Sequence, residues 1–367
     1  MPRHYLDHAS TSPLRPSARQ AMVQWLDTPV GDPGRVHHEG MTARVALEHA
    51  RDQMAAFLRV RPREVVFTSG ATESIVTAVR GAAGRGGHQV VSAVEHSAVR
   101  SAAEATGAEV VVVSVDGTGR VNPDDVLAAI PTDTALVSVQ YGNHEVGTVQ
   151  PVEPIVAACR EREVLIHIDA AQAVGRVPLD LGSLGADLVS ISGHKLGAPM
   201  GTGVLVIRRG LRIEPLLVGG DQERARRAGL ENLPALMGLG AAAEELTDTL
   251  DSEIEHSRQL TDRLRAGLDT IDGLTQYGHP EHRLPHLVCM GFAGLEPQPV
   301  LMGLDRAGIA AHSGSACSSE ALEPSPVLDA MGVDAMRSLR LSVGWSSTSA
   351  DIDAALDALP RIMNDLV

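Results

Sequence analysis

Short apolar runs alternate with helix-like segments from about residue 64 to residue 210. The runs are nearly continuous and rich in Val and Ile, a pattern typical of strands that are buried on both faces. Their alternation with helices predicts a mostly parallel sheet that is covered on both sides. Ligand sites in such folds lie at the carboxyl ends of the strands, so we expect the chemistry there. The expected strands are 65–68, 90–93, 110–115, 135–140, 164–169, 188–190 and 204–207, and the expected helices are 73–81, 97–106, 123–130 and 154–162.

The C-terminal third of the chain predicts a second, smaller α/β domain. Residues 234–268 are rich in Ala and Glu and favour one long or broken helix that leaves the large domain. Beyond it we expect strands at 286–292 and 338–343 and helices at 298–307 and 350–366. A chain of 367 residues exceeds the usual size of one core. We therefore expect a large domain of residues 13–245 and a small domain of residues 1–12 and 246–367.

The composition excludes several classes of protein. No apolar run approaches the ~20 residues of a membrane span, and the first ten residues lack an apolar signal region. Three Cys without paired spacing favour a reducing, cytoplasmic setting. A net charge of −15 argues against a nucleic-acid partner. The 15 His are scattered, so no metal site is expected.

Lys195 is the only lysine in the chain, and every other basic position of the Lys and Arg total is Arg. Arginine cannot form an imine with an aldehyde, because its guanidinium group stays protonated and delocalised. A lysine that is desolvated to a neutral amine can do so. A single lysine is explained equally well by chance in a chain of biased composition. The residues around Lys195 must therefore distinguish a functional lysine from a chance one.

Four segments after predicted strands hold residues that suit pyridoxal phosphate, an aldehyde cofactor. Residues 68–74 (TSGATES) place a glycine before a helix start, whose free N–H groups bind phosphate. An ordinary capping box gives the same pattern. Asp169 ends a buried strand, where pairing with a pyridinium nitrogen would stabilise its charge, and Gln172 follows within reach of the ring hydroxyl. The alternative for Asp169 is a helix cap.

The third segment, SISGHK, is the most specific of these signals. Ser192 and His194 are candidate phosphate donors, and Lys195 follows them directly. A fourth segment places His96 after the strand at 90–93, where its ring is suited to stacking on the cofactor and to proton transfer. A histidine at a helix start also occurs without any such role.

The sequence resembles the class V aminotransferase superfamily and, within it, the cysteine desulfurases. The resemblance implies a homodimer of the type I pyridoxal-phosphate fold with the active site at the dimer interface. It also implies that Lys195 forms the imine, and that Asp169, Gln172 and His96 face the ring nitrogen, the ring oxygen and the ring face. The phosphate ligands implied are Ala71, Thr72, Ser192 and His194. The matching segments are YLDHASTSPL, VVFTSGATES, AVEHSAV, NHEVGTVQP, HIDAAQAVGRVPLDL, SGHKLGAPMGTGVL and AHSGSACSSEALEPSPVLDAMGV.

The same resemblance implies the reaction. Arg340 and Asn143 are expected to bind the substrate, and a guanidinium fork suits the carboxylate of L-cysteine. Cys317 lies in the segment HSGSACSSE and is expected to take sulfur as a persulfide, leaving L-alanine, and to pass it to an acceptor protein. The GSAC form resembles desulfurases that deliver sulfur from a mobile loop. Cys159 and Cys289 fall in apolar patterns and are expected to be inert core residues.

Three departures from the family pattern keep alternatives open. His144 stands where the family has an Asn that contacts the ring oxygen, and Leu230 replaces a Thr that reaches the phosphate of the partner subunit. The chain ends at Val367 without the extension that housekeeping members use to engage an iron–sulfur scaffold, so we expect a specialised acceptor. The alternatives are a selenocysteine lyase or related class V lyase or aminotransferase, and a weakly catalytic scaffold that binds the cofactor.

Overall fold

The computed structural model describes residues 3–27, 31–313 and 324–366. Its centre is a seven-stranded sheet in the order β2-β8-β7-β6-β5-β3-β4, in which only β8 runs antiparallel to its neighbours. This confirms the predicted mostly parallel sheet. The seven strands are β2 (Val65–Thr68), β3 (His88–Ser92), β4 (Glu109–Val113), β5 (Thr134–Gln140), β6 (Ile166–Asp169), β7 (Leu188–Ser192) and β8 (Gly203–Ile207).

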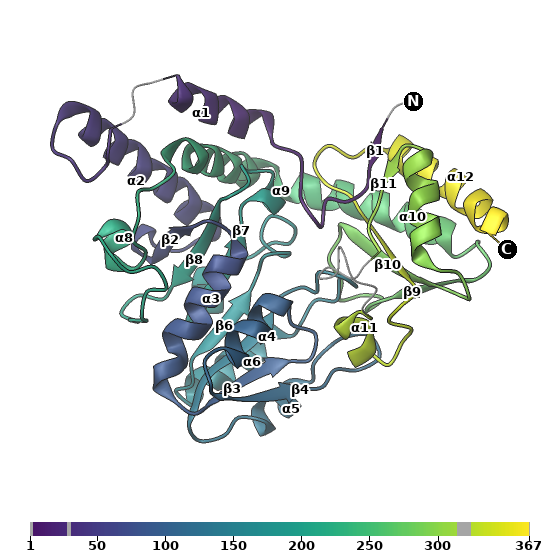
Figure 1. The fold of residues 1–367 in the computed structure, drawn as a ribbon, viewed down its shortest axis with the longest axis horizontal. Helices are drawn as coiled ribbons and strands as arrows, with labels where there is room; N and C mark the ends of the chain where they lie inside the picture. The colour runs from purple at the N-terminus through teal and green to yellow at the C-terminus, as the bar shows by residue number, and fades with distance from the viewer. Residues whose placement is uncertain (1–2, 28–30, 314–323, 367) are drawn as a thin grey trace.

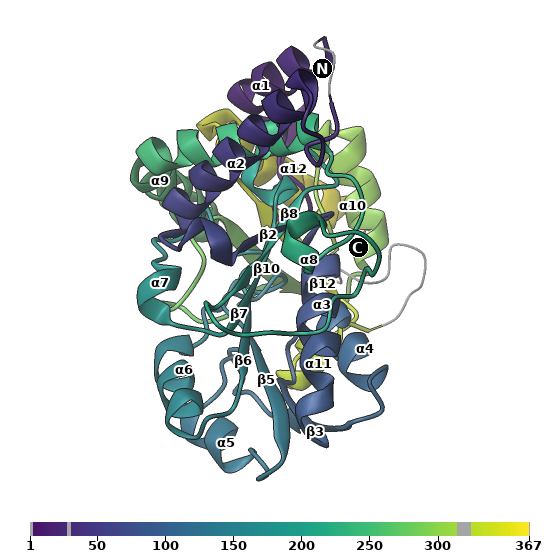
Figure 2. The same ribbon diagram turned by 90° about the vertical axis from the view of Figure 1, so that its left-hand side faces the viewer.

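Helices cover both faces of this sheet. In Figure 2, α3 and α4 lie on one side, and α5, α6 and α7 lie on the other. Successive residues of β2 alternate between the two faces: Val65 and Phe67 join one hydrophobic cluster, and Val66 joins the other. The helices are α3 (Ala71–Ala82), α4 (Ser97–Glu104), α5 (Pro123–Ala128), α6 (Val152–Glu161) and α7 (Leu181–Leu184).

A long helix, α9 (Leu233–Leu268), connects the two halves of the molecule (Figure 1). Its first part packs against α1 (Pro16–Leu26) and α2 (His38–Leu58), and Leu239 and Leu246 join the core of the large sheet. Leu264, near its end, joins a second core. The predicted long helix is therefore confirmed and is unbroken.

The second core is built on a three-stranded antiparallel sheet in the order β12-β10-β9. The N-terminal strand β1 (His4–Tyr5) pairs in parallel with β11 (Ile309–Ala310), so the start of the chain lies against its C-terminal part. The boundary between residues 245 and 246 stays a prediction. The remaining elements are α8 (Gln222–Ala225), β9 (Leu274–Tyr277), β10 (Leu287–Phe292), α10 (Pro297–Arg306), α11 (Pro326–Ala330), β12 (Ser338–Ser342) and α12 (Ser349–Leu366).

Candidate active site

A cavity of about 660 Å³ opens where β2, β3, β5, β6 and β7 end, between the large sheet and β12. Its position follows from the parallel sheet, because the loops after parallel strands meet at one edge. Ten of the residues proposed for the site from the sequence line it: Ala71, Thr72, His96, His144, Asp169, Gln172, Ser192, His194, Lys195 and Arg340.

Lys195 lies in a short 3-10 turn, three residues after the end of β7, and lines this cavity. Burial lowers the pKa of its amine to about 8, and the positive charges of Arg340 and Arg176 act in the same direction. Asp169 opposes them. A lysine with a pKa near 8 has a substantial neutral fraction at physiological pH, and the neutral amine is the nucleophile that attacks an aldehyde.

Two features at one end of the cavity suit an anion. Helix α3 begins after Gly70 without a side-chain cap, which leaves N–H groups of its first turn available to a ligand. A Cβ on Gly203 would lie 2.6 Å from the Gly70 backbone, so glycine at 203 lets β8 approach the start of this helix. The buried Ser192 hydroxyl has no hydrogen-bond partner among the described residues. A phosphate group would satisfy both the hydroxyl and the helix start.

His194 borders the same end of the cavity, and its Nδ1 lies 3.1 Å from the Thr11 hydroxyl. Burial lowers its pKa to about 4, with a smaller effect of Lys195, so the ring is neutral at physiological pH. A neutral imidazole still offers one N–H to a ligand.

Asp169 ends β6 and Gln172 follows it, and both line the cavity. The backbone N–H of Ala171 donates to Oδ1 of Asp169 at 3.0 Å. The Gln172 amide donates to the Ala9 carbonyl at 2.7 Å, and its oxygen lies 3.2 Å from Nε2 of His286. The expected contact of Gln172 with a ring hydroxyl would therefore compete with two protein partners.

His96 and His144 face each other with ring centroids 5.1 Å apart in an edge-on arrangement. Nδ1 of His96 accepts a hydrogen bond from the N–H of Ala98 at the start of α4. Burial and the neighbouring His144 lower the pKa of His96 to about 4, so His96 is neutral with its proton on Nε2. His144 also lies 3.5 Å from the carboxylate of Glu145.

Arg340, on β12, is buried beside the N-terminal segment. Its guanidinium group donates to the His144 carbonyl at 2.6 Å, to Ser10 at 2.8 Å and to Asp7 at 3.1 Å. Its Nε has no hydrogen-bond partner among the described residues. A buried guanidinium group with a free N–H at the cavity wall suits a carboxylate ligand.

Two expected site residues differ from this group. Asn143 does not line the cavity, because its amide donates to Val94 and its oxygen accepts from the N–H groups of Glu145 and Val146. Its expected contact with the substrate stays a prediction. Cys317 lies outside the described residues.

The other two cysteines are buried free thiols, as predicted for core residues. Burial raises the pKa of Cys159 to about 11 and that of Cys289 to about 12. Neither thiol ionises at physiological pH, so neither offers a reactive thiolate. The described residues include no group of three His, Cys, Asp or Glu that could hold a metal, and none of their helices could span a bilayer.

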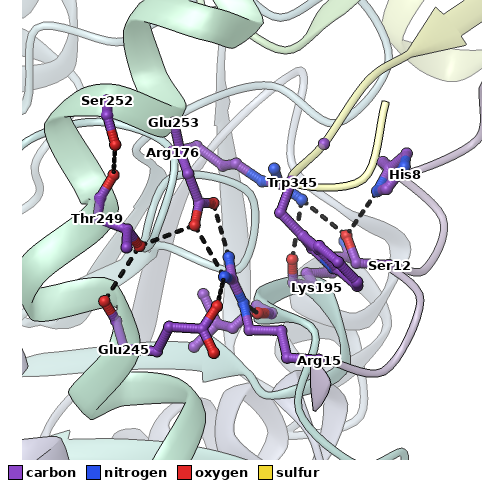
Figure 3. A network of polar contacts seen from close by, with 12 residues as sticks. His8, Ser12, Arg15, Arg176, Lys195, Glu245, Thr249, Ser252, Glu253 and Trp345 are labelled. Atoms are coloured by element: carbon purple, nitrogen blue, oxygen red, sulfur yellow. Dashed lines mark hydrogen bonds and ion pairs between the residues drawn. The ribbon is translucent and has the colours of Figure 1, made fainter. Parts of the chain in front are cut away.

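A network of polar residues around the backbone of Lys195 was not expected from the sequence (Figure 3). Arg176 donates to the Lys195 carbonyl at 3.0 Å and to Ser12 at 2.8 Å. Arg15 forms ion pairs with Glu245 and Glu253 on α9. The available signal was that Ser12 and Arg176 both lie inside segments that carry the family resemblance.

Comparisons with known proteins identify the family of this chain. The model of the aminotransferase class-V family matches residues 4–355. The chain belongs to the class-V aminotransferase family. A protein named cysteine desulfurase IscS from Methanosarcina thermophila is 41% identical over 99% of this chain and 92% of its own length. Another of that name, from Dictyoglomus turgidum, is 39% identical over 99% and 95%.

Solved structures show the same fold over the whole chain. A structure described as a NifS-like protein superposes with a TM-score of 0.93 at 32% identity and covers 100% of both chains. A structure described as SspA in complex with cysteine superposes with a TM-score of 0.83 at 28% identity, covering 94% of this chain and 100% of its own. These neighbours confirm the expected α/β fold.

Proposed function

We propose that this protein is a pyridoxal-phosphate-dependent cysteine desulfurase that converts L-cysteine to L-alanine and passes the sulfur to an acceptor protein. The observation that carries the proposal is one cavity that combines three features. These are the depressed pKa of Lys195, the free hydroxyl of Ser192 beside the start of α3, and the free Nε of Arg340. They match an aldehyde, a phosphate and a carboxylate respectively.

The residues present fit the cofactor. Ser192, His194 and the first turn of α3, with Ala71 and Thr72, would hold the phosphate. Lys195 would hold the aldehyde carbon, and Asp169 would hold the ring nitrogen in its protonated form. When bound, the cofactor supplies an electron-withdrawing ring that stabilises negative charge next to the amino group of an amino acid.

The protein's own groups then supply orientation, proton transfer and the sulfur acceptor. Arg340 orients the substrate carboxylate, and the neutral Lys195 amine takes the proton from the substrate α-carbon. The Cys317 thiolate attacks the substrate sulfur, so a sulfur–sulfur bond forms as the carbon–sulfur bond breaks. The electron pair left on carbon takes up a proton to give alanine. His96, neutral with its proton on Nε2, would lie against the ring face.

Loss of the Cys317 thiol tests the reaction. We expect Cys317→Ala to abolish sulfide and alanine release from L-cysteine while the visible absorbance of the bound cofactor is retained. Cys159→Ala serves as the control, because Cys159 is a buried thiol outside the cavity. Sulfide release by Cys317→Ala at an undiminished rate would falsify the persulfide step, and a related lyase reaction would remain.

The replacements at His144 and Leu230 motivate a second candidate, a weakly catalytic scaffold that binds the cofactor. The convergence of Lys195, Asp169 and Arg340 on one cavity favours the enzyme, since a scaffold needs none of them. Alanine formation by the wild-type protein separates the two candidates. The rates of alanine formation from L-cysteine and from L-selenocysteine, measured side by side, decide between a desulfurase and a selenocysteine lyase.

We also propose that the protein forms a homodimer and acts in the reducing cytoplasm. Large apolar side chains lie exposed along α2 and in the segment 217–230, and Met200, which lines the cavity, is also exposed. Contiguous exposed apolar surface usually marks an interface. The two described cysteines are free thiols, which agrees with a reducing compartment.

A further inference from the structure

The backbone turn that carries Lys195 is held at four successive carbonyl groups. The His194 carbonyl accepts from the N–H of Ser12, and the Lys195 carbonyl accepts from the Arg176 side chain. The Leu196 carbonyl accepts a hydrogen bond from Nε of Arg15 at 2.7 Å. The Gly197 carbonyl accepts one from the backbone N–H of Arg15 at 2.8 Å. The backbone on both sides of the lysine is therefore fixed by three residues distant in sequence.

Arg176 is the unusual member of this set. It is buried and forms no ion pair among the described residues, so its charge lies in the interior without a carboxylate in contact. The nearby carboxylates of Glu245 and Glu253 are instead bound by Arg15 (Figure 3). An uncompensated buried cation is costly, so its retention calls for a role.

The Ser12 hydroxyl connects Arg176 to His8, and the direction of both hydrogen bonds follows from the chemistry of the guanidinium group. A guanidinium group only donates, so the Ser12 oxygen accepts from Arg176 and its own hydrogen points to Nδ1 of His8, 3.0 Å away. Burial and the positive charge of Arg176 lower the pKa of His8 to about 3, so His8 is neutral and able to accept. The chain from Arg176 to Ser12 to His8 thus ends without a counter-charge.

We propose that Arg176 is a positioning residue for Lys195: it fixes the lysine carbonyl and places a buried positive charge next to the turn that carries the lysine. This inference rests on the proposed function only in one respect, namely that the Lys195 amine reacts with the cofactor and the substrate. The electrostatic effect itself is a property of the chain without cofactor or substrate.

Other charged groups around Lys195 also act on the pKa of its amine. Arg340, on β12, also lowers the pKa of the amine, whereas Asp169 at the end of β6 and Asp7 in the N-terminal segment raise it. The histidines His96, His194 and His286 have lowered pKa values and are neutral at the pH of interest. His144 faces His96 from the loop after β5.

The single lysine makes the test direct. The full-length chain, freed of cofactor, is methylated with formaldehyde and cyanoborohydride over a range of pH, and the peptide that contains residue 195 is quantified by mass spectrometry. We expect Arg176→Gln to raise the midpoint of Lys195 modification by about 1 pH unit. This is the order expected for unit charges roughly 10 Å apart at an effective dielectric constant of about 20. An unchanged midpoint in a folded Arg176→Gln chain overturns the proposal.

Arg265→Gln is the matched control, because burial likewise lowers the pKa of Arg265 to about 10, yet it belongs to α9 and bonds Gln276 away from the cavity. It should leave the midpoint of Lys195 unchanged. Arg176→Lys is avoided because it adds a second lysine. A chain that proves inactive on cysteine leaves the lysine titration intact, so failure of the proposed function is distinguishable from failure of this inference.

Glu253→Gln gives a second test that does not remove Arg176. Glu253 is the negative charge that acts against the positive charges of Arg15 and Arg176. Without this negative charge, the surroundings of Arg15 and Arg176 become more positive. The pH midpoint of Lys195 methylation should therefore fall. Opposite shifts in Arg176→Gln and Glu253→Gln are an electrostatic signature that general loosening of the fold does not produce. A rise or no change in Glu253→Gln contradicts the proposal.

Discussion

Glu95 shows how a single buried side chain sets the electrostatics beneath the cavity. Its Oε1 accepts hydrogen bonds from Ser92 and from the N–H of Gln140, and its Oε2 has no partner among the described residues. Burial raises the pKa of this carboxyl group to about 8, and Asp169 adds to the rise. Glu95 is therefore mostly protonated at neutral pH.

This carboxyl group makes stability fall as pH rises. The folded pKa of about 8 exceeds the ordinary value of 4.5, so the folded state binds more protons between those values. The stabilisation is complete below about pH 4.5 and is lost as pH approaches 8. We expect Glu95→Gln to match the wild type near pH 5 and to exceed its free energy of unfolding by about 2–4 kcal/mol at pH 8.5.

Urea unfolding of the cofactor-free chain at the two pH values measures this difference. Glu161→Gln, at an exposed position at the end of α6, is the control and should not change the slope with pH. An equal loss of stability between pH 5 and pH 8.5 in wild type and Glu95→Gln would show that Glu95 does not titrate in this range.

Residues at strand ends were predictable, but their partners were not. Lys195 and Asp169 follow buried strands, so the parallel sheet alone places them at one edge. The role of Arg176 depends on Ser12, 164 positions away in sequence, and that contact exists only once α9 and the N-terminal segment are packed. The side-chain oxygen of Asn143 similarly accepts from the backbone N–H of Glu145, a local contact that its sequence position does not reveal.

At the scale of elements, strands buried on both faces were found to within two residues, because a continuous apolar run leaves little choice of register. Helices α1 and α2 were not predicted, although Ala43, Leu47, Ala50 and Met54 recur on one buried face of α2. The edge strand β9 was also missed. It pairs only with β10 and is partly exposed, so tertiary pairing rather than local pattern defines it.

The contact between β8 and the start of α3 supports a prediction about the phosphate site. Because a Cβ on Gly203 would lie 2.6 Å from the Gly70 backbone, Gly203→Ala must push these two elements apart. We expect the dissociation constant for pyridoxal phosphate to rise at least about tenfold, since loss of one good phosphate contact costs roughly 1.5 kcal/mol.

Fluorescence titration of the cofactor-free chain measures this affinity. Gly84→Ala is a suitable control, because a Cβ there meets no atom within 4 Å. Unchanged affinity in Gly203→Ala would mean that the start of α3 does not form the phosphate site.

The whole molecule presents apolar side chains that its own fold does not cover. Val218 is 81% exposed, Val45 on α2 is 67% exposed and Leu230 is 63% exposed. Helix α2 and the segment around α8 lie next to each other, joined by an ion pair between Glu48 and Arg224. Leu230 stands where the resemblance implies a contact with the partner subunit, so an apolar contact would replace the hydrogen bond of a Thr there.

A charge at these positions should therefore separate the proposed subunits. We expect wild-type protein to sediment as a dimer, and Val218→Glu combined with Leu230→Glu to shift it toward the monomer, because burying two carboxylates in an apolar interface costs several kcal/mol. Val112→Glu, at a 57% exposed valine on the edge strand β4, controls for the added charge and should remain dimeric. Because Met200 is both exposed and part of the cavity wall, the monomer should also bind pyridoxal phosphate more weakly. A dimer that persists in the double variant would place the interface on another face of the molecule.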